Sequence, residues 1–222
     1  MEFLPSIIND YTKNHTEKES KLLANLNRET WKNVMMPRML SGHLQGRILS
    51  MFSKILSPSN ILEIGTYTGY SGICLAEGLK NNGILHTIDI NEEYSSVARR
   101  YFNNSKYKNQ IKQYIGNAID IIPKLSCSFQ LVYIDADKKN YCNYFDSVIN
   151  NVDLGGLIIA DNVLWSGKVT ESFKDNDTKS IDQGRSSITE LKAINIAITE
   201  TGIAIHFRCF LLSYRLIALI QS

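Results

Sequence analysis

The order of apolar and polar positions divides the chain into a helical first part and a mixed second part. Before residue 58, apolar residues recur every three or four positions, as Leu22, Leu23 and Leu26 do. This spacing places them on one face of a helix. Pro37 interrupts the pattern, and Pro58 ends it. We therefore expect an N-terminal helical segment over residues 1–57.

From residue 58 onward, short apolar runs alternate with helical stretches. Five runs are predicted as strands, at residues 61–64, 84–90, 111–115, 131–134 and 157–160. Strands that alternate with helices in this way are typical of parallel βαβ units. Two later β-rich runs, 203–211 and 215–220, predict an antiparallel hairpin, and the polar stretch 166–186 predicts a surface loop.

Composition favours one globular domain over the 222 residues, of which 44% are hydrophobic. Charge is balanced, with 24 Lys+Arg against 22 Asp+Glu, so no general field attracts nucleic acid or a membrane surface. No apolar run is long enough to span a bilayer, and the first residues lack the pattern of a secretory signal. The four cysteines form no C-x-x-C pair, which disfavours a zinc site. We expect a cytoplasmic protein.

Candidate chemistry gathers where the predicted strands end, because ligands of open α/β sheets bind beyond the carboxyl ends of the strands. Three of these five ends carry a carboxylate. The residues that follow the strands, or close them, are Gly65, Asp89, Gly116 with Asn117, Asp135, and Asp161 with Asn162.

The turn after the first strand reads E-I-G-T-Y-T-G, from Glu63 to Gly69. Its glycines let the backbone pass close to a ligand. The turn lacks the G-x-G-x-x-G pattern of dinucleotide sites and resembles the first motif of S-adenosylmethionine methyltransferases. Asp89, twenty residues past Gly69, suits the hydroxyls of a ribose, which a nicotinamide cofactor also carries. The alternatives are an ordinary strand–helix turn and, for Asp89, a cap for a helix at Asn91.

The ends of the fourth and fifth strands bring three oxygen-bearing side chains to one sheet edge: Asp135, Asp161 and Asn162. Hard divalent cations such as Mg²⁺ prefer such oxygen ligands. Lys138 follows Asp135 by three residues and is expected to lean over the same site. Without a metal, these acids would be exposed carboxylates at strand ends.

Five segments together resemble the cation-dependent O-methyltransferases, which include catechol and caffeoyl-CoA O-methyltransferases and small bacterial relatives. They are L-E-I-G-T-Y-T-G-Y-S, I-D-I-N-E-E-Y, G-N-A-I-D-I-I-P, Y-I-D-A-D-K-K-N-Y and A-D-N-V-L-W-S-G, within about residues 36–167. The last two are the most specific, and they look closer to the caffeoyl-CoA type. The resemblance implies a Rossmann-like methyltransferase fold in one domain (1–57 helical, 58–222 α/β core). Its sheet would be mostly parallel and seven-stranded, with helices on both faces and an antiparallel C-terminal hairpin.

The resemblance also implies roles for individual residues. Asp135, Asp161 and Asn162 match the metal ligands, for Mg²⁺ first and Ca²⁺ or Mn²⁺ as alternatives, and Lys138 matches the general base. The positions that match the lining of the S-adenosylmethionine site are Met39, Ser41, Glu63, Gly65, Tyr67, Ser71, Asp89, Ala118 and Asp135. The implied acceptor is a catechol-like hydroxyl of a small molecule or acyl-CoA, and the implied assembly is a homodimer with no membrane partner.

Three alternative functions are weighed against the sequence. Some bacterial relatives methylate a hydroxylated wobble uridine of tRNA, and a local patch of Lys106, Lys108, Lys112 and Lys168 would suit that substrate. A nicotinamide dehydrogenase is disfavoured by the missing glycine fingerprint, and a donor-binding protein without catalysis by the intact set of site residues. The family's Gly-Asp-Gly-like turn is replaced by L-S-Y-R at 212–215, so the acceptor does not follow from the resemblance.

Overall fold

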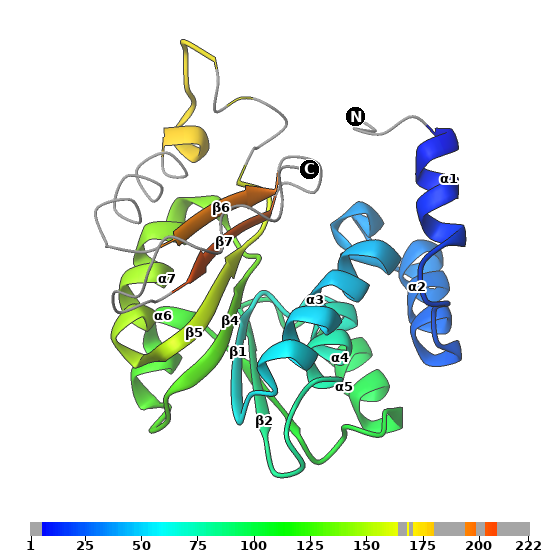
Figure 1. Ribbon diagram of the computed structural model, residues 1–222, viewed down its shortest axis with the longest axis horizontal. Coiled ribbons are helices and arrows are strands. Elements are labelled where there is room, and N and C mark those ends of the chain that lie inside the picture. The colour runs from blue at the N-terminus through cyan, green and yellow to red at the C-terminus, as the bar shows by residue number, and fades with distance from the viewer. Residues whose placement is uncertain (1–5, 164–167, 169–170, 180–193, 199–202, 208–222) are drawn as a thin grey trace.

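The computed structural model describes residues 6–163, 168, 171–179, 194–198 and 203–207. Seven strands form one sheet in the order β3-β2-β1-β4-β5-β7-β6 (Figure 1). The first five strands are parallel and confirm the predicted βαβ pattern. Their bounds are β1 Asn60–Ile64, β2 Ile84–Asp89, β3 Ile111–Ile115, β4 Phe129–Ile134 and β5 Val152–Ala160.

Helices cover both faces of this sheet because alternate side chains of the central strands are apolar on both sides. Ile61 packs with residues of α3 and α4, whereas Leu62 packs with residues of α6 and α7. In Figure 1, α3 and α4 lie on one side of the sheet and α6 and α7 on the other. The helices are α1 Ser6–Asn14, α2 Lys21–Asn33, α3 Gly42–Leu56, α4 Tyr70–Ala76, α5 Ser95–Asn104, α6 Ala118–Ile121 and α7 Tyr141–Val148. None of the described helices is long and apolar enough to cross a membrane.

The N-terminal helices pack on the α4–α5 side of the sheet. Ser20 caps α2, since its side chain accepts a hydrogen bond from the Leu23 backbone N–H at 3.3 Å. Leu23 and Leu26 of α2 are buried against α4 and α5. A short 3₁₀ turn, Pro37–Met39, then leads into α3. This turn therefore connects α2 to α3.

Of the predicted hairpin of 203–211 with 215–220, the first run contains an observed antiparallel strand, whereas its hairpin partner precedes it in the chain. β7, Ile203–Phe207, pairs with β5, and its other partner is β6, Ile194–Ile198. Residues 208–222 lie outside the described part, and so do 11 of the 21 residues of the predicted 166–186 loop; among its described residues, 176–179 are helical. Sequence analysis missed β6, although its sequence I-N-I-A-I alternates with the period of a strand.

The strand order changes direction between β1 and β4, since β2 and β3 lie on one side of β1 and β5 lies beyond β4. Such a switch point leaves a crevice beyond the carboxyl ends of the two central strands. The fold therefore brings the end of β1 next to the end of β4, which carry Gly65 and Asp135.

Candidate active site

Gly65 ties the end of β1 to the end of β4 through backbone contact. Its φ is +106°, and a Cβ atom built on it would lie 1.9 Å from the carbonyl oxygen of Asp135. Only glycine fits such an approach. The Asp135 backbone N–H donates to the Ile64 carbonyl at 2.8 Å. The predicted donor turn and the predicted metal site are therefore direct neighbours.

Glu63 is fully buried beside this turn. The Thr87 hydroxyl donates to its Oε2 at 2.6 Å, while its Oε1 has no hydrogen-bond partner among the described residues. Burial raises the pKa of Glu63 to about 7, and the Ser71 and Thr87 hydroxyls oppose this rise. A buried carboxylate with an unused oxygen suits a ligand that brings a donor or a positive charge.

Asp89 closes β2 with both of its carboxylate oxygens bound to backbone. Oδ2 accepts from the Tyr67 N–H at 2.7 Å, and Oδ1 accepts from the Asn91 N–H at 2.8 Å. The contact with Asn91 agrees with the capping alternative, although α5 begins only at Ser95. Capping and ribose binding are compatible, because each oxygen has a further lone pair.

Tyr67 joins this turn to the segment before α3. Its backbone is left-handed at φ 48°, and its hydroxyl donates to the carbonyls of Met35 at 3.2 Å and Met36 at 3.1 Å. Met36 is also left-handed, at φ 59°. Two residues predicted to line the donor site follow in this segment. Met39 is largely exposed, and Ser41 directly precedes α3.

The two remaining residues predicted for the donor site stand at helix starts. Ser71 is buried in the first turn of α4. Ala118 opens α6 and is also buried, and the side chain of Asn117 caps this helix by accepting from the Ile119 N–H at 3.1 Å. Both residues follow a strand and its turn, so they lie at the ligand-binding edge of the sheet.

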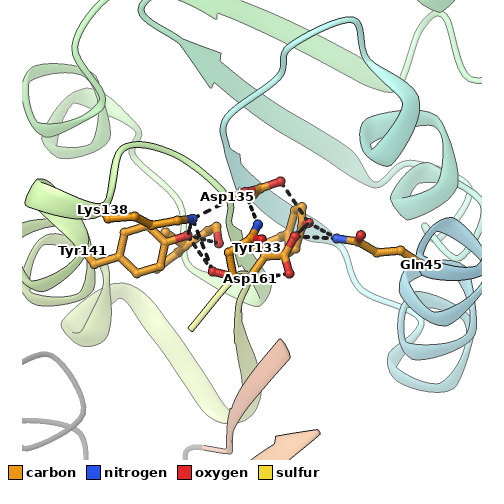
Figure 2. A network of polar contacts seen from close by, with 8 residues as sticks. Gln45, Tyr133, Asp135, Lys138, Tyr141 and Asp161 are labelled. Carbon is orange, nitrogen blue, oxygen red and sulfur yellow. Dashed lines mark hydrogen bonds and ion pairs between the residues drawn. The ribbon is translucent and has the colours of Figure 1, made fainter. Parts of the chain in front are cut away.

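The predicted metal ligands share one network of polar contacts (Figure 2). The Asn162 amide nitrogen lies 3.4 Å from Asp135 Oδ1, and the Tyr133 hydroxyl lies 3.2 Å from Asp161 Oδ2 and 3.4 Å from Asp135 Oδ2. Asp161 is only 4% exposed. Its burial, with the charge of Asp135 nearby, raises the pKa of the Asp161 carboxyl. Asn162 has a left-handed backbone at φ 58°, which a non-glycine residue adopts only at a cost.

These residues fit a divalent cation in their donor set. Two carboxylates held close repel each other, and a cation between them would relieve that repulsion. The described residues hold no cluster of three or more His, Cys, Asp or Glu side chains suited to a metal. A cation at this point would rely on two carboxylates only, those of Asp135 and Asp161, together with the amide oxygen of Asn162, and water or a substrate would complete its shell. The amide nitrogen of Asn162 now faces Asp135, and a flip of the amide exchanges the two atoms.

Lys138 lies in the same network and is almost fully buried. Its Nζ is 3.7 Å from Asp135 Oδ1 and 3.3 Å from the Asp161 carbonyl oxygen, and it donates to the Tyr141 hydroxyl (Figure 2). Burial lowers the pKa of Lys138, while the charges of Asp135 and Asp161 oppose this change. A buried amine beside two proposed metal ligands is suited to accept a proton.

Three residues of this network were missed by sequence analysis: Gln45, Tyr133 and Tyr141. The Gln45 side chain donates to Asp161 Oδ2 at 2.6 Å, and Tyr141 donates to the Asp161 carbonyl at 2.8 Å. The two tyrosines flank the D-A-D-K motif and are both buried, and a buried hydroxyl needs a partner. That was a usable signal. Gln45 gave none, because its partner lies 116 positions away in the chain.

The family follows from comparison with known proteins. A model of the O-methyltransferase family matches residues 13–204. The chain belongs to this family. It is 34% identical over 170 residues to the catechol O-methyltransferase of Niastella koreensis, with 75% of this chain and 76% of that protein covered. The predicted family and the assignment as a methyltransferase are thereby confirmed.

Other relatives of this O-methyltransferase agree with the assignment. The caffeoyl-CoA O-methyltransferase of Petroselinum crispum is 33% identical over 153 residues, which cover 66% of this chain and 64% of that enzyme. Among solved structures, the O-methyltransferase TomG from Streptomyces achromogenes, in complex with SAM, superposes with a TM-score of 0.82. That match is 24% identical and covers 91% of this chain and 96% of TomG, so it supports the Rossmann-like methyltransferase fold.

Proposed function

We propose that the protein uses a divalent cation to methylate one hydroxyl of a catechol-like vicinal diol, on a small molecule or an acyl-CoA, with S-adenosylmethionine as donor. One observation carries the proposal: the Asp135–Asp161–Asn162 set and the buried Lys138 lie directly against the Gly65 turn. A donor turn and a cation site at one switch point would hold two reactants side by side.

The donor is proposed to lie along the ends of β1 and β2. Asp89 would bind its ribose, and the free oxygen of Glu63 would suit its positively charged part. The full proposed set is Met39, Ser41, Glu63, Gly65, Tyr67, Ser71, Asp89, Ala118 and Asp135. TomG, whose structure contains SAM, has the same fold, which supports a donor site at this sheet edge.

The cation is proposed to bind Asp135, Asp161 and Asn162, with Mg²⁺ favoured and Ca²⁺ or Mn²⁺ as alternatives. When bound, it would stabilise the acceptor oxyanion and orient a vicinal diol through two coordination positions. The proposal draws support from the two crowded carboxylates and from the neutral donors Gln45 and Tyr133 on one side of them.

The chain's own residues would then place the acceptor and move its proton. A free phenol has a pKa of about 10, so little phenolate exists at pH 7. Lys138 would take the hydroxyl proton while the acceptor oxygen bonds to the methyl carbon and the carbon–sulfur bond breaks, which leaves S-adenosylhomocysteine. Good alignment of two reactants lowers a barrier by about 7–11 kcal/mol. We therefore assign most of the catalysis to placement.

The direct test measures methyl transfer from labelled S-adenosylmethionine to a panel of catechols, including caffeoyl-CoA, with Mg²⁺ and with EDTA. We expect transfer that EDTA abolishes, and the preferred acceptor would identify the substrate class. Transfer that persists in EDTA would contradict the cation role. Donor binding without transfer to any catechol would contradict the acceptor class and favour tRNA, whose binding should then weaken steeply with salt.

We also propose that residues 1–222 form one catalytic domain and that the protein acts as a homodimer. Buried contacts of α2 with α4 and α5 support a shared core for the N-terminal helices and the sheet. Light scattering on a sizing column would measure the mass, and a monomer at working concentration would contradict the dimer.

A further inference from the structure

Gln45 reaches from α3 to the ends of β4 and β5 (Figure 2). Its Nε2 donates to Asp161 Oδ2 at 2.6 Å and to the Tyr133 hydroxyl at 2.8 Å. Tyr133 is fully buried in β4. Its hydroxyl in turn lies 3.2 Å from Asp161 Oδ2 and 3.4 Å from Asp135 Oδ2. The Gln45 amide therefore contacts one carboxylate of the proposed cation site, and the Tyr133 phenol contacts both.

The Gln45 amide and the Tyr133 phenol together carry three protons that can be donated in hydrogen bonds. An amide nitrogen carries two protons, and Gln45 uses one for Asp161 and the other for Tyr133. A phenol carries one proton, which Tyr133 can share with only one carboxylate at a time. Both donors of the amide and the single donor of the phenol are thus directed within this network. The Asp161 carboxylate is consequently fixed in its rotation, since its Oδ1 also accepts from the Asn162 N–H at 2.7 Å.

Gln45 and Tyr133 differ in charge from other side chains that could donate to the same carboxylate oxygens. An amide and a phenol are neutral, so they orient a carboxylate and leave its negative charge in place. A lysine or arginine at the same place would neutralise Asp161 and compete with a cation. Lys138, the charged neighbour in this network, lies 3.7 Å from Asp135 Oδ1. The neutral donors on the Gln45 side leave that face of the site negative.

We propose that Gln45 and Tyr133 are positioning residues for the divalent cation, which hold the Asp161 and Asp135 carboxylates in orientation without neutralising them. The inference rests on the proposed function, because it places a cation at Asp135, Asp161 and Asn162. Groups that orient metal ligands in this way change metal affinity by roughly 10–100-fold.

The test uses the variants Gln45→Met and Tyr133→Phe, which remove the donors and nearly keep the shapes. Calorimetric titration with Mg²⁺ alone should show a dissociation constant weakened about 10-fold or more. Affinity for S-adenosylhomocysteine should not change. Turnover should fall at low Mg²⁺ and recover at high Mg²⁺, so that the apparent KM for Mg²⁺ rises while kcat stays. A variant damaged in its fold would not recover in this way.

Tyr144→Phe is the matched control. It also deletes a buried tyrosine hydroxyl bound to an acid, at 2.5 Å from Asp137 Oδ1, but Asp137 is not a proposed ligand. Its Mg²⁺ affinity should equal that of the unaltered protein. A difference of the same size as in Tyr133→Phe would overturn the inference, because any lost tyrosine hydroxyl would then have this effect.

The remaining outcomes separate this inference from the proposed function. Unchanged Mg²⁺ affinity in the folded variants, with the unaltered protein binding Mg²⁺, would overturn the inference alone. No Mg²⁺ binding by the unaltered protein would overturn the cation role itself and the inference with it. If Tyr133→Phe does not fold, Gln45→Met decides the question, because Gln45 is only partly buried.

Discussion

The two sides of the site are held by different kinds of contact. At the ends of β1 and β2, the backbone supplies most of them: Gly65 lies against the Asp135 carbonyl, and Asp89 accepts from two backbone N–H groups. At the ends of β4 and β5, side chains bind one another across distant elements. Gln45 from α3 and Lys138 both reach Asp161, the first through its carboxylate and the second through its carbonyl.

Because of this difference, we expect single substitutions to act differently on the two sides of the site. The contact of Gly65 depends on backbone conformation, so the donor side should fail where this glycine is replaced. Side-chain contacts depend on each partner, so the cation side is sensitive to any one of several residues. The predictions below test this contrast in order of decreasing effect.

Asp161→Ala should give the largest effect, because it removes a proposed ligand and the acceptor of two side-chain donors. Turnover should fall at least about 10³-fold, which corresponds to roughly 4 kcal/mol of lost charge stabilisation. Affinity for S-adenosylhomocysteine should persist in large part, since the donor side does not depend on this carboxylate. Enzyme kinetics and calorimetry measure the two effects, with the exposed Asp146→Ala as control. Full activity of Asp161→Ala with the metal removed would refute the cation mechanism.

Gly65→Ala should disrupt the donor side through a change in the backbone, and not through the loss of a side chain. The added methyl group would meet the Asp135 carbonyl at 1.9 Å in a left-handed conformation. Conformational strain and overpacking together should lower the free energy of unfolding by about 2–6 kcal/mol. Urea denaturation measures this loss, and S-adenosylhomocysteine binding should be lost with it.

Gly155→Ala is the control that separates conformational strain from the steric contact in that prediction. Gly155 has a similar positive φ of 83°, but a Cβ atom there would meet nothing within 4 Å. Its cost should be limited to the conformational strain, about 1–2 kcal/mol. Equal losses in the two variants would mean that the contact with Asp135 contributes nothing.

The same contrast explains what could be predicted from sequence. The five parallel strands and the residues that end them follow from apolar runs and the rule for open sheets, so Gly65, Asp89, Asp135 and Asp161 were placed at one edge in advance. Strand β6 was missed, although its sequence I-N-I-A-I alternates as a strand does. Gln45 was missed because it meets Asp161 only in the folded chain, and no local pattern encodes a contact between a helix and a distant strand end.

Glu63→Gln tests whether the donor side carries an uncompensated charge. Burial raises the pKa of Glu63 from 4.5 to about 7, so the folded protein keeps this proton at a pH where the unfolded chain has lost it. The stability that the protonated form contributes is complete below pH 4.5 and is lost as pH rises through about 7. The unaltered protein should therefore lose about 3 kcal/mol relative to Glu63→Gln between these limits. Urea denaturation of both proteins from pH 5 to 8 measures the difference, and parallel profiles would contradict the buried charge.

Tyr67→Phe should give the smallest effect, because it removes the one side-chain contact that ties the donor turn to the Met35 and Met36 carbonyls. A hydrogen bond of this kind contributes about 0.5–1.5 kcal/mol, so affinity for S-adenosylhomocysteine should fall about 2–10-fold while global stability changes little. Trypsin should also cut faster after the exposed Arg38. Tyr94→Phe is the control, since its ring packs edge-to-face on Tyr67 at 5.2 Å and, within the described residues, its hydroxyl makes no hydrogen bond to Met35 or Met36. Equal behaviour of the two variants would show that backbone contacts alone hold the donor side, and would sharpen the contrast with the cation side.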